Sequence, residues 1–123
     1  MSGSKVVPVV ITQRSGEPDV VSAFETAERA EKSKISGWAE SFDFELTDPI
    51  IIDLGTELSN DTVLSDIIGM VEQMKSDGIV AASTEYLRRA GLYGLLPEAL
   101  KKAGKRVWIA DLGSLPIEDR ISA

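Results

Sequence analysis

Short aliphatic runs separate longer amphipathic stretches along the 123 residues of the chain. Such runs are typical of strands buried on both faces, as in parallel sheets that are covered by helices. Pro8 within the first run favours an early or edge position in the sheet, because proline cannot donate to the hydrogen-bond ladder. The run before Asp53 contains only isoleucine and favours a central strand. The predicted strands cover residues 6–11, 50–55, 79–82 and 106–113.

The stretches between these strands carry apolar residues at helical spacing. Asp19 is placed to cap a first helix that extends to Lys34, and Gly37 is expected to break it. In residues 35–47, large apolar side chains alternate with polar ones as in a half-exposed strand. Three further helices are predicted, the clearest from Asn60 or Asp61 to Gly78 and two shorter ones over residues 86–90 and 95–103.

This order of elements predicts the fold class. Strands that alternate with helices through short glycine-containing turns pair in parallel through right-handed crossovers. We therefore expect a single three-layer α/β domain over residues 1–123, with helices on both faces of a mostly parallel sheet of about four or five strands. A flavodoxin-like arrangement has this order. Loose ends are expected over residues 1–4 and 114–123.

The chain contains no cysteine and no histidine. Disulfides, thiolate nucleophiles, zinc sites built from cysteine or histidine, Ser-His-Asp triads and histidine general bases are therefore excluded from this sequence. The remaining chemistry depends on carboxylates, hydroxyls, lysine, arginine or backbone groups. Because no catalytic motif replaces the missing side chains, the sequence favours a protein without catalytic activity over an enzyme.

The balance of charges is acidic, with 13 basic and 20 acidic residues and a formal net charge of −7. A negative chain repels a phosphate backbone and lacks the counterion release that drives most nucleic-acid binding, so we expect no nucleic acid as a partner. The apolar runs are far shorter than the roughly 20 residues that cross a bilayer. The first residues also lack the features of a secretory signal. We therefore expect a cytoplasmic protein that makes no contact with a membrane.

In an open parallel sheet, ligands bind beyond the carboxyl ends of the strands. Asp53 and Asp111 follow two of the predicted strands, and Asp61 lies a few residues after the first of them. If the carboxylates converge, they can hold Mg²⁺ for hydrolysis or phosphoryl transfer. Each aspartate is also typical of a turn, in which its side chain accepts hydrogen bonds from the following amides. Apart from Mg²⁺ under this alternative, no cofactor is expected.

The polar loop after the first strand contains Arg14, Ser15 and Gly16. Arg14 offers a fork of donors to an anion, and the helix that follows presents its positive N-terminus to the same place. The loop lacks the glycine and lysine patterns of nucleotide-binding loops. It fits either an anion-binding site or an ordinary connection between a strand and a helix.

One segment of the sequence resembles a known family. A buried strand ends in Asp53-Leu54, Asp61-Thr62 comes next, and an amphipathic helix closes at Gly78. With this pattern, residues 50–96 resemble the STAS domain, the fold of anti-sigma-factor antagonists and of stressosome subunits. The resemblance implies a STAS-like fold in which a partner kinase phosphorylates Thr62. From the residues alone, Asp61-Thr62 is also typical of a plain helix N-cap.

Three functions remain open. The first, which we favour, is a non-enzymatic regulatory or protein-interaction module that is switched by phosphorylation at a helix start, and it requires an exposed Thr62. The second is a small Mg²⁺-dependent hydrolase or phosphoryl-transfer enzyme that uses Asp53 and Asp111. The third is an accessory subunit whose apolar patch is covered by a larger partner or by a second copy in a homo-oligomer. The candidate patch contains Tyr93, Leu95, Leu96 and Leu115.

Overall fold

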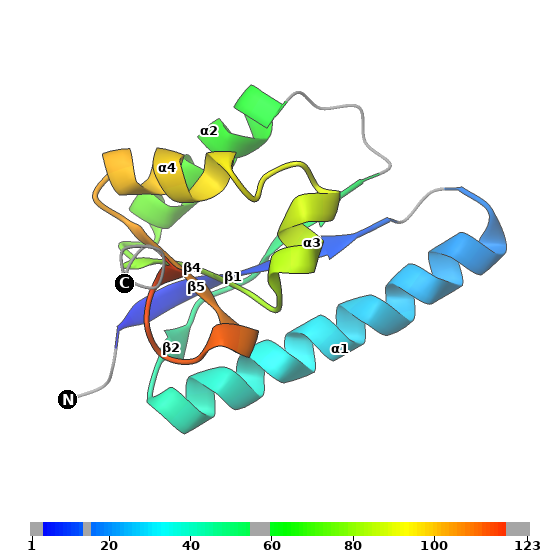
Figure 1. Cartoon of the computed structure of the whole chain (residues 1–123), viewed down its shortest axis with the longest axis horizontal. Coiled ribbons are helices and arrows are strands. Elements are labelled where there is room, and N and C mark those ends of the chain that lie inside the picture. Colours follow the sequence, from blue (N-terminus) through cyan, green and yellow to red (C-terminus); the bar gives the residue numbers. More distant parts are fainter. Residues whose placement is uncertain (1–3, 14–15, 55–59, 118–123) are drawn as a thin grey trace.

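The structure, a computed structural model, describes residues 4–13, 16–54 and 60–117. In these residues, parallel strands form one sheet, with α1 along one face and α2 and α4 across the other (Figure 1). The expected α/β fold with a mostly parallel sheet is confirmed. The elements are β1 (Lys5–Thr12), α1 (Pro18–Phe42), β2 (Glu45–Leu46), β3 (Ile50–Asp53), α2 (Asn60–Gln73), β4 (Gly78–Ala81), α3 (Thr84–Arg89), α4 (Leu95–Lys102), β5 (Arg106–Ile109) and the short 3-10 helix η1 (Ala110–Leu112).

β1 lies inside the sheet, with β4 on one side and both β2 and β3 on the other. β2 and β3 pair with successive parts of β1, so together they act as one interrupted edge strand. β5 forms the opposite edge, beyond β4. The edge position expected for the strand with Pro8 is therefore wrong, and so is the central position expected for the strand that ends at Asp53.

Pro8 is tolerated inside the sheet because of the direction in which its nitrogen points. Backbone groups of successive residues in a strand point alternately to the two neighbouring strands. The Thr47 amide donates to the Val6 carbonyl at 3.0 Å, and the Asp77 amide before β4 donates to the Lys5 carbonyl at 2.7 Å. Even-numbered residues of β1 therefore face β2 and β3. The nitrogen of Pro8 faces the interruption between these two strands, where the missing N–H costs no ladder bond.

α1 is longer than expected. It begins at Pro18 and runs for 25 residues to Phe42, through Gly37, where the sequence predicted a break. Its second half buries Ile35, Trp38 and Ala39 against the sheet. This packing outweighs the ~1 kcal/mol by which a glycine disfavours a helix interior. Of the strand expected over residues 35–47, only β2 forms.

The ends of α1 also differ from the prediction. Pro18 occupies the first turn and Glu17 is the N-cap residue, so Asp19 lies inside the helix instead of capping it. A fixed φ suits proline to this first position, where its missing N–H is not needed. Asp43 ends the helix in the left-handed region, with φ 59°.

Two apolar cores lie on the two faces of the sheet. The larger one joins odd-numbered residues of β1 to α2, α3 and α4 through side chains such as Val9, Ile67 and Leu96. The smaller one lies under α1 and is built around Trp38, Trp108 and residues of β1 and β4. Trp38 stacks on Phe44 at 4.3 Å between ring centroids, and its indole nitrogen donates to the Gly113 carbonyl at 2.8 Å.

The segment after η1 is partly packed. Pro116 and Ile117 are buried, and Ile117 joins the larger core, so the loose end expected from Ser114 does not begin there. Residues 118–123 and 1–3 lie outside the described part of the chain. None of the helices in the described ranges combines the length and apolar character that crossing a membrane requires.

Candidate functional site

A cavity of about 450 Å³ opens beside the edge strand β3. Its position follows from register and sequence. Ile50 and Ile52 pair with Val9 and Ile11 and share their face of the sheet, the face that α2 covers. The cavity lies between β3, α2 and the end of α3. Its apolar lining includes Ile50, Ile52, Leu54, Val63, Ile67 and Leu92, and its polar lining includes Asp53, Asp66 and Arg89. A concave, mostly apolar site with a few polar groups is the usual form of a binding site.

The cations near the cavity are already engaged. The Arg89 guanidinium lies 2.9 Å from a Glu85 carboxylate oxygen and 5.9 Å from the ring centroid of Tyr86. Arg88 lies over the ring of Tyr93 at 4.6 Å. Both arginines therefore lie against partners of their own short helix or the turn after it, and the Glu85 carboxylate partly offsets the charge of Arg89.

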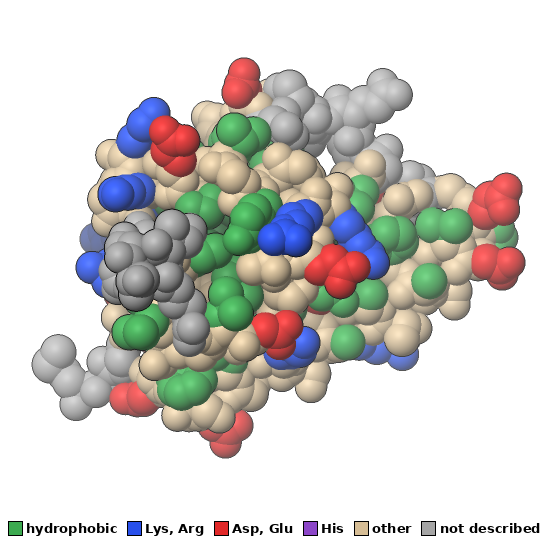
Figure 2. Space-filling model, in the orientation of Figure 1, with side chains coloured by type: hydrophobic (Ala, Val, Ile, Leu, Met, Phe, Trp, Pro, Cys, Tyr) green, Lys and Arg blue, Asp and Glu red, His purple; other side chains and the backbone are tan. Residues whose placement is uncertain are grey.

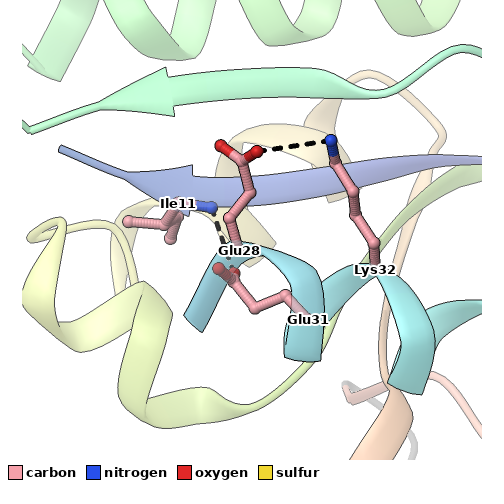
Figure 3. Close-up of polar contacts among 4 residues, drawn as sticks. All are labelled: Ile11, Glu28, Glu31 and Lys32. Atoms are coloured by element: carbon pink, nitrogen blue, oxygen red, sulfur yellow. Dashed lines mark hydrogen bonds and ion pairs between the residues drawn. The ribbon is translucent and has the colours of Figure 1, made fainter. Parts of the chain in front are cut away.

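A buried carboxylate lies on the other face of the sheet, near the carboxyl end of β1. Glu31 of α1 is 1% exposed, and one of its oxygens accepts the Ile11 amide at 3.1 Å (Figure 3). Ile11 is odd-numbered, so its amide faces the β4 side, and β4 pairs with β1 only as far as Val9. Glu31 thus satisfies a backbone donor that has passed the end of the neighbouring strand.

The second oxygen of Glu31, Oε2, has no hydrogen-bond partner among the described residues. Burial raises the pKa of Glu31 from 4.5 to about 7; the Ile11 amide opposes this rise, and the nearby Glu28 carboxylate adds to it. The neutral form is therefore favoured well into the range in which an exposed carboxylate is ionised. Sequence reasoning missed this group. The available signal was an acidic residue in the apolar stripe of α1.

The structure does not bring Asp53 and Asp111 together. Asp53 ends β3 at one edge of the sheet, and Asp111 follows β5 at the opposite edge. Three strand spacings separate these edges by roughly 14 Å. Asp111 instead forms an ion pair with Lys34 of α1 at 2.9 Å. The two strand-end carboxylates therefore cannot share one Mg²⁺ ion, and the described residues contain no cluster of three or more acidic side chains able to hold a metal.

The structure describes some of the remaining candidate site residues and leaves others out. Asp61 and Thr62 are exposed in the first turn of α2. Arg14 and Ser15 lie outside the described residues. Gly16 is exposed with φ 123°, a conformation that L side chains rarely adopt, so a glycine is required for this path of the loop.

Only part of the expected apolar patch lies on the surface of the protein. Leu96 is fully buried in the larger core and is no part of it. Leu95 and Leu115 are exposed, and Tyr93 is half-buried under Arg88. A patch that loses its central leucine gives weaker support to an accessory subunit.

No family model and no curated protein matches this chain. Among solved structures, the fold is similar to the C-terminal catalytic domain of ISC1926 TnpA, an IS607-like serine recombinase. The likeness has a TM-score of 0.60 at 16% sequence identity and covers 96% of this chain and 78% of that one. At such low identity it shows a shared α/β fold.

Proposed function

We propose that this chain is a regulatory or protein-interaction module without catalytic activity, and that it binds an apolar side chain of a partner protein in the cavity beside β3. The observation that carries the proposal is the cavity itself, whose aliphatic walls run along β3 and reach the carboxyl edge of the sheet at Asp53 and Leu54. Ligands of parallel α/β sheets bind at this edge. The charged residues described in the lining, Asp53, Asp66 and Arg89, are better suited to orienting a bound partner than to catalysing a reaction.

The charges around this edge favour a protein ligand over a phosphorylated one. Among the described residues, Asp53 and Asp66 line the cavity, and Arg89 in the same lining lies against Glu85. Two carboxylates beside a partly neutralised cation repel a phosphate group. The formal net charge of −7 acts in the same direction.

Phosphorylation of Thr62 supplies a switch for this module. Thr62 is exposed one residue before Val63, which lines the cavity. A phosphate in the first turn of a helix gains from the helix dipole, and it changes the charge that a partner meets. The resemblance of residues 50–96 to the STAS domain supports the same role for Thr62.

The test is quantitative capture of binding proteins by the full chain and by variants. Val63→Arg places a charge in the cavity wall, and Glu40→Arg, which makes a larger positive charge change at an exposed position of α1, is the control. We expect a partner that the wild type and Glu40→Arg retain and that Val63→Arg and Thr62→Glu lose. Equal capture by Val63→Arg would refute the cavity as the binding site.

A second candidate is favoured by the likeness to the recombinase domain. That neighbour is a serine recombinase, and this chain carries Ser15 in the sequence between β1 and α1. The candidate function is phosphoryl transfer on DNA with Ser15 as the nucleophile. A covalent adduct between wild-type protein and DNA that is lost in Ser15→Ala would establish it. Such an adduct would also refute our expectation that nucleic acid is not a partner.

A further inference from the structure

α1 runs past the end of the sheet. A helix of 25 residues is roughly 37 Å long, about ten ångströms more than the eight residues of β1 can span. Its first turns extend beyond the strands (Figure 1). All buried residues of α1 lie at position 31 or later, and none of residues 18–30 is buried.

The apolar stripe of α1 continues onto this projecting half. Residues 20, 24, 27, 31, 35 and 38 recur at the spacing of one helix face. The last three, Glu31, Ile35 and Trp38, are buried, whereas Val20 is 40% exposed and Phe24 and Ala27 are half-buried. Figure 2 shows hydrophobic side chains along the end of the molecule where α1 projects. In the described part of the chain, Val20 is therefore exposed and Phe24 and Ala27 are only half-buried, so this stretch of the stripe is less covered than the second half of α1.

Acidic residues predominate around this stripe: Glu28 is paired with Lys32 at 3.4 Å, and Arg29 lies about 180° around the helix from Val20. Residues 17–28 contain Glu17, Asp19, Glu25 and Glu28 and no lysine or arginine. Asp19 and Glu25 flank the stripe on its two sides, at helix angles of about 100° or more from Val20. Two copies of this segment would place acidic flanks against each other, which is unfavourable. A segment with basic flanks is complementary.

We propose that the first half of α1, residues 17–30, is a docking surface for a basic amphipathic helix of a partner protein, which packs apolar side chains on Val20, Phe24 and Ala27 and sets lysine or arginine beside Asp19 and Glu25. An isolated helix of about 12 residues is marginal in water, so packing against a partner also stabilises this half. The surface is distinct from the cavity beside β3, which lies on the opposite face of the sheet, and the inference goes beyond the proposed function.

The probe for this surface is a synthetic peptide of about 14 residues, with leucines at helical spacing and lysines beside them. Two further peptides serve as controls, one with glutamate in place of lysine and one with the basic composition in scrambled order. Binding to the full chain is measured by fluorescence anisotropy. We expect only the ordered basic peptide to bind, with affinity that falls as salt screens the flanking charges.

Variants then locate the site. Phe24→Glu and Val20→Glu put a charge on the stripe, and Asp19→Lys combined with Glu25→Lys reverses the flanks. We expect each to weaken peptide binding about tenfold. Glu40→Lys combined with Glu72→Lys makes the same charge change at exposed positions elsewhere and should leave binding within about twofold. The helical signal in far-UV circular dichroism checks that each variant is folded.

Four results would overturn the proposal. Equal binding of the scrambled peptide, or an equal loss in the Glu40 and Glu72 variant, would reduce the effect to net charge. Self-association that Phe24→Glu abolishes would make a second copy the occupant. Loss of peptide binding in Val63→Arg with retention in Phe24→Glu would move the peptide to the cavity. If Val63→Arg changes neither peptide binding nor partner capture, the proposed function fails and the docking surface on α1 stands.

Discussion

The two halves of α1 share one apolar stripe and meet different surroundings. In the second half, Ile35 and Trp38 pack against the sheet and Glu31 reaches the β1 backbone, whereas in the first half Phe24 lies at an equivalent position and stays half-exposed. Helical periodicity is the same in both. The difference arises because β1 ends at Thr12, so the sheet covers only part of the helix. Periodicity therefore identifies the apolar face of a helix, but it does not show whether other parts of the fold pack against that face.

The largest difference between the halves should come from truncating their aromatic residues. Trp38→Ala removes the stacking on Phe44 and the hydrogen bond to the Gly113 carbonyl, and it leaves a cavity in the smaller core. We expect a loss of about 3–5 kcal/mol in the free energy of unfolding. Urea denaturation at neutral pH measures it. A cost below about 1 kcal/mol would show that the second half of α1 is not the anchored half.

The next effect concerns the pH dependence that Glu31 confers. Its pKa is raised from 4.5 to about 7 in the folded protein, so the folded state holds the proton more tightly than the unfolded state. The stabilisation is complete below the unfolded pKa and is lost as pH rises through the folded one. We expect the wild type to lose about 2–3 kcal/mol relative to Glu31→Gln between roughly pH 4 and pH 8, after allowance for solvent screening.

Urea denaturation of both proteins across this pH range gives the difference directly, because the other carboxylates are common to both. Glutamine keeps an oxygen for the Ile11 amide and removes the titration. A difference that stays constant with pH, or that grows in the opposite direction, would contradict the raised pKa of Glu31.

A smaller effect is expected at Gly37, which lies in the helix where the sequence predicted a break. The position is exposed, and a Cβ added there meets no atom within 4 Å. Gly37→Ala should therefore raise the free energy of unfolding by about 0.5–1 kcal/mol. Thermal and urea unfolding check the sign. Destabilisation would mean that α1 is not helical at this residue.

The smallest effect should come from the projecting half. Phe24→Ala removes a half-exposed ring that no described residue covers fully, and we expect a change of about 0.5 kcal/mol or less in the free energy of unfolding. Amide hydrogen exchange sharpens the comparison, because residues 18–30 should exchange faster than residues 31–42. Protection of both halves to the same degree would show that the first half is covered in solution.

Much of the fold was accessible from local pattern. The isoleucine run before Asp53, the stripe of α2 and the strand that carries Trp108 were all predicted within a few residues, because each element's periodicity reports how it is buried. Parallel pairing followed from the alternation of strands and helices.

The candidate site was less accessible, because its parts meet only through tertiary packing. The cavity exists because β3 lies at the edge of the sheet. A run of isoleucines is compatible with an edge strand and with a central strand, so the sequence did not distinguish the two positions. Asp53 and Asp111 are each followed by leucine and glycine in the sequence, and only the strand order puts them on opposite edges. Whether the two aspartates could share one ligand could not be decided before that order was known.

The sequence by itself determined the kinds of element, their order, the α/β class and the acidic charge without histidine or cysteine. The tertiary structure alone decided three things: which strand is central, how far α1 extends past Gly37, and that Glu31 is buried with one oxygen that no described residue hydrogen-bonds. The physical reason is the range of the interactions. Propensity and periodicity act over a few residues, whereas strand order and the burial of a side chain depend on contacts between segments far apart in the chain.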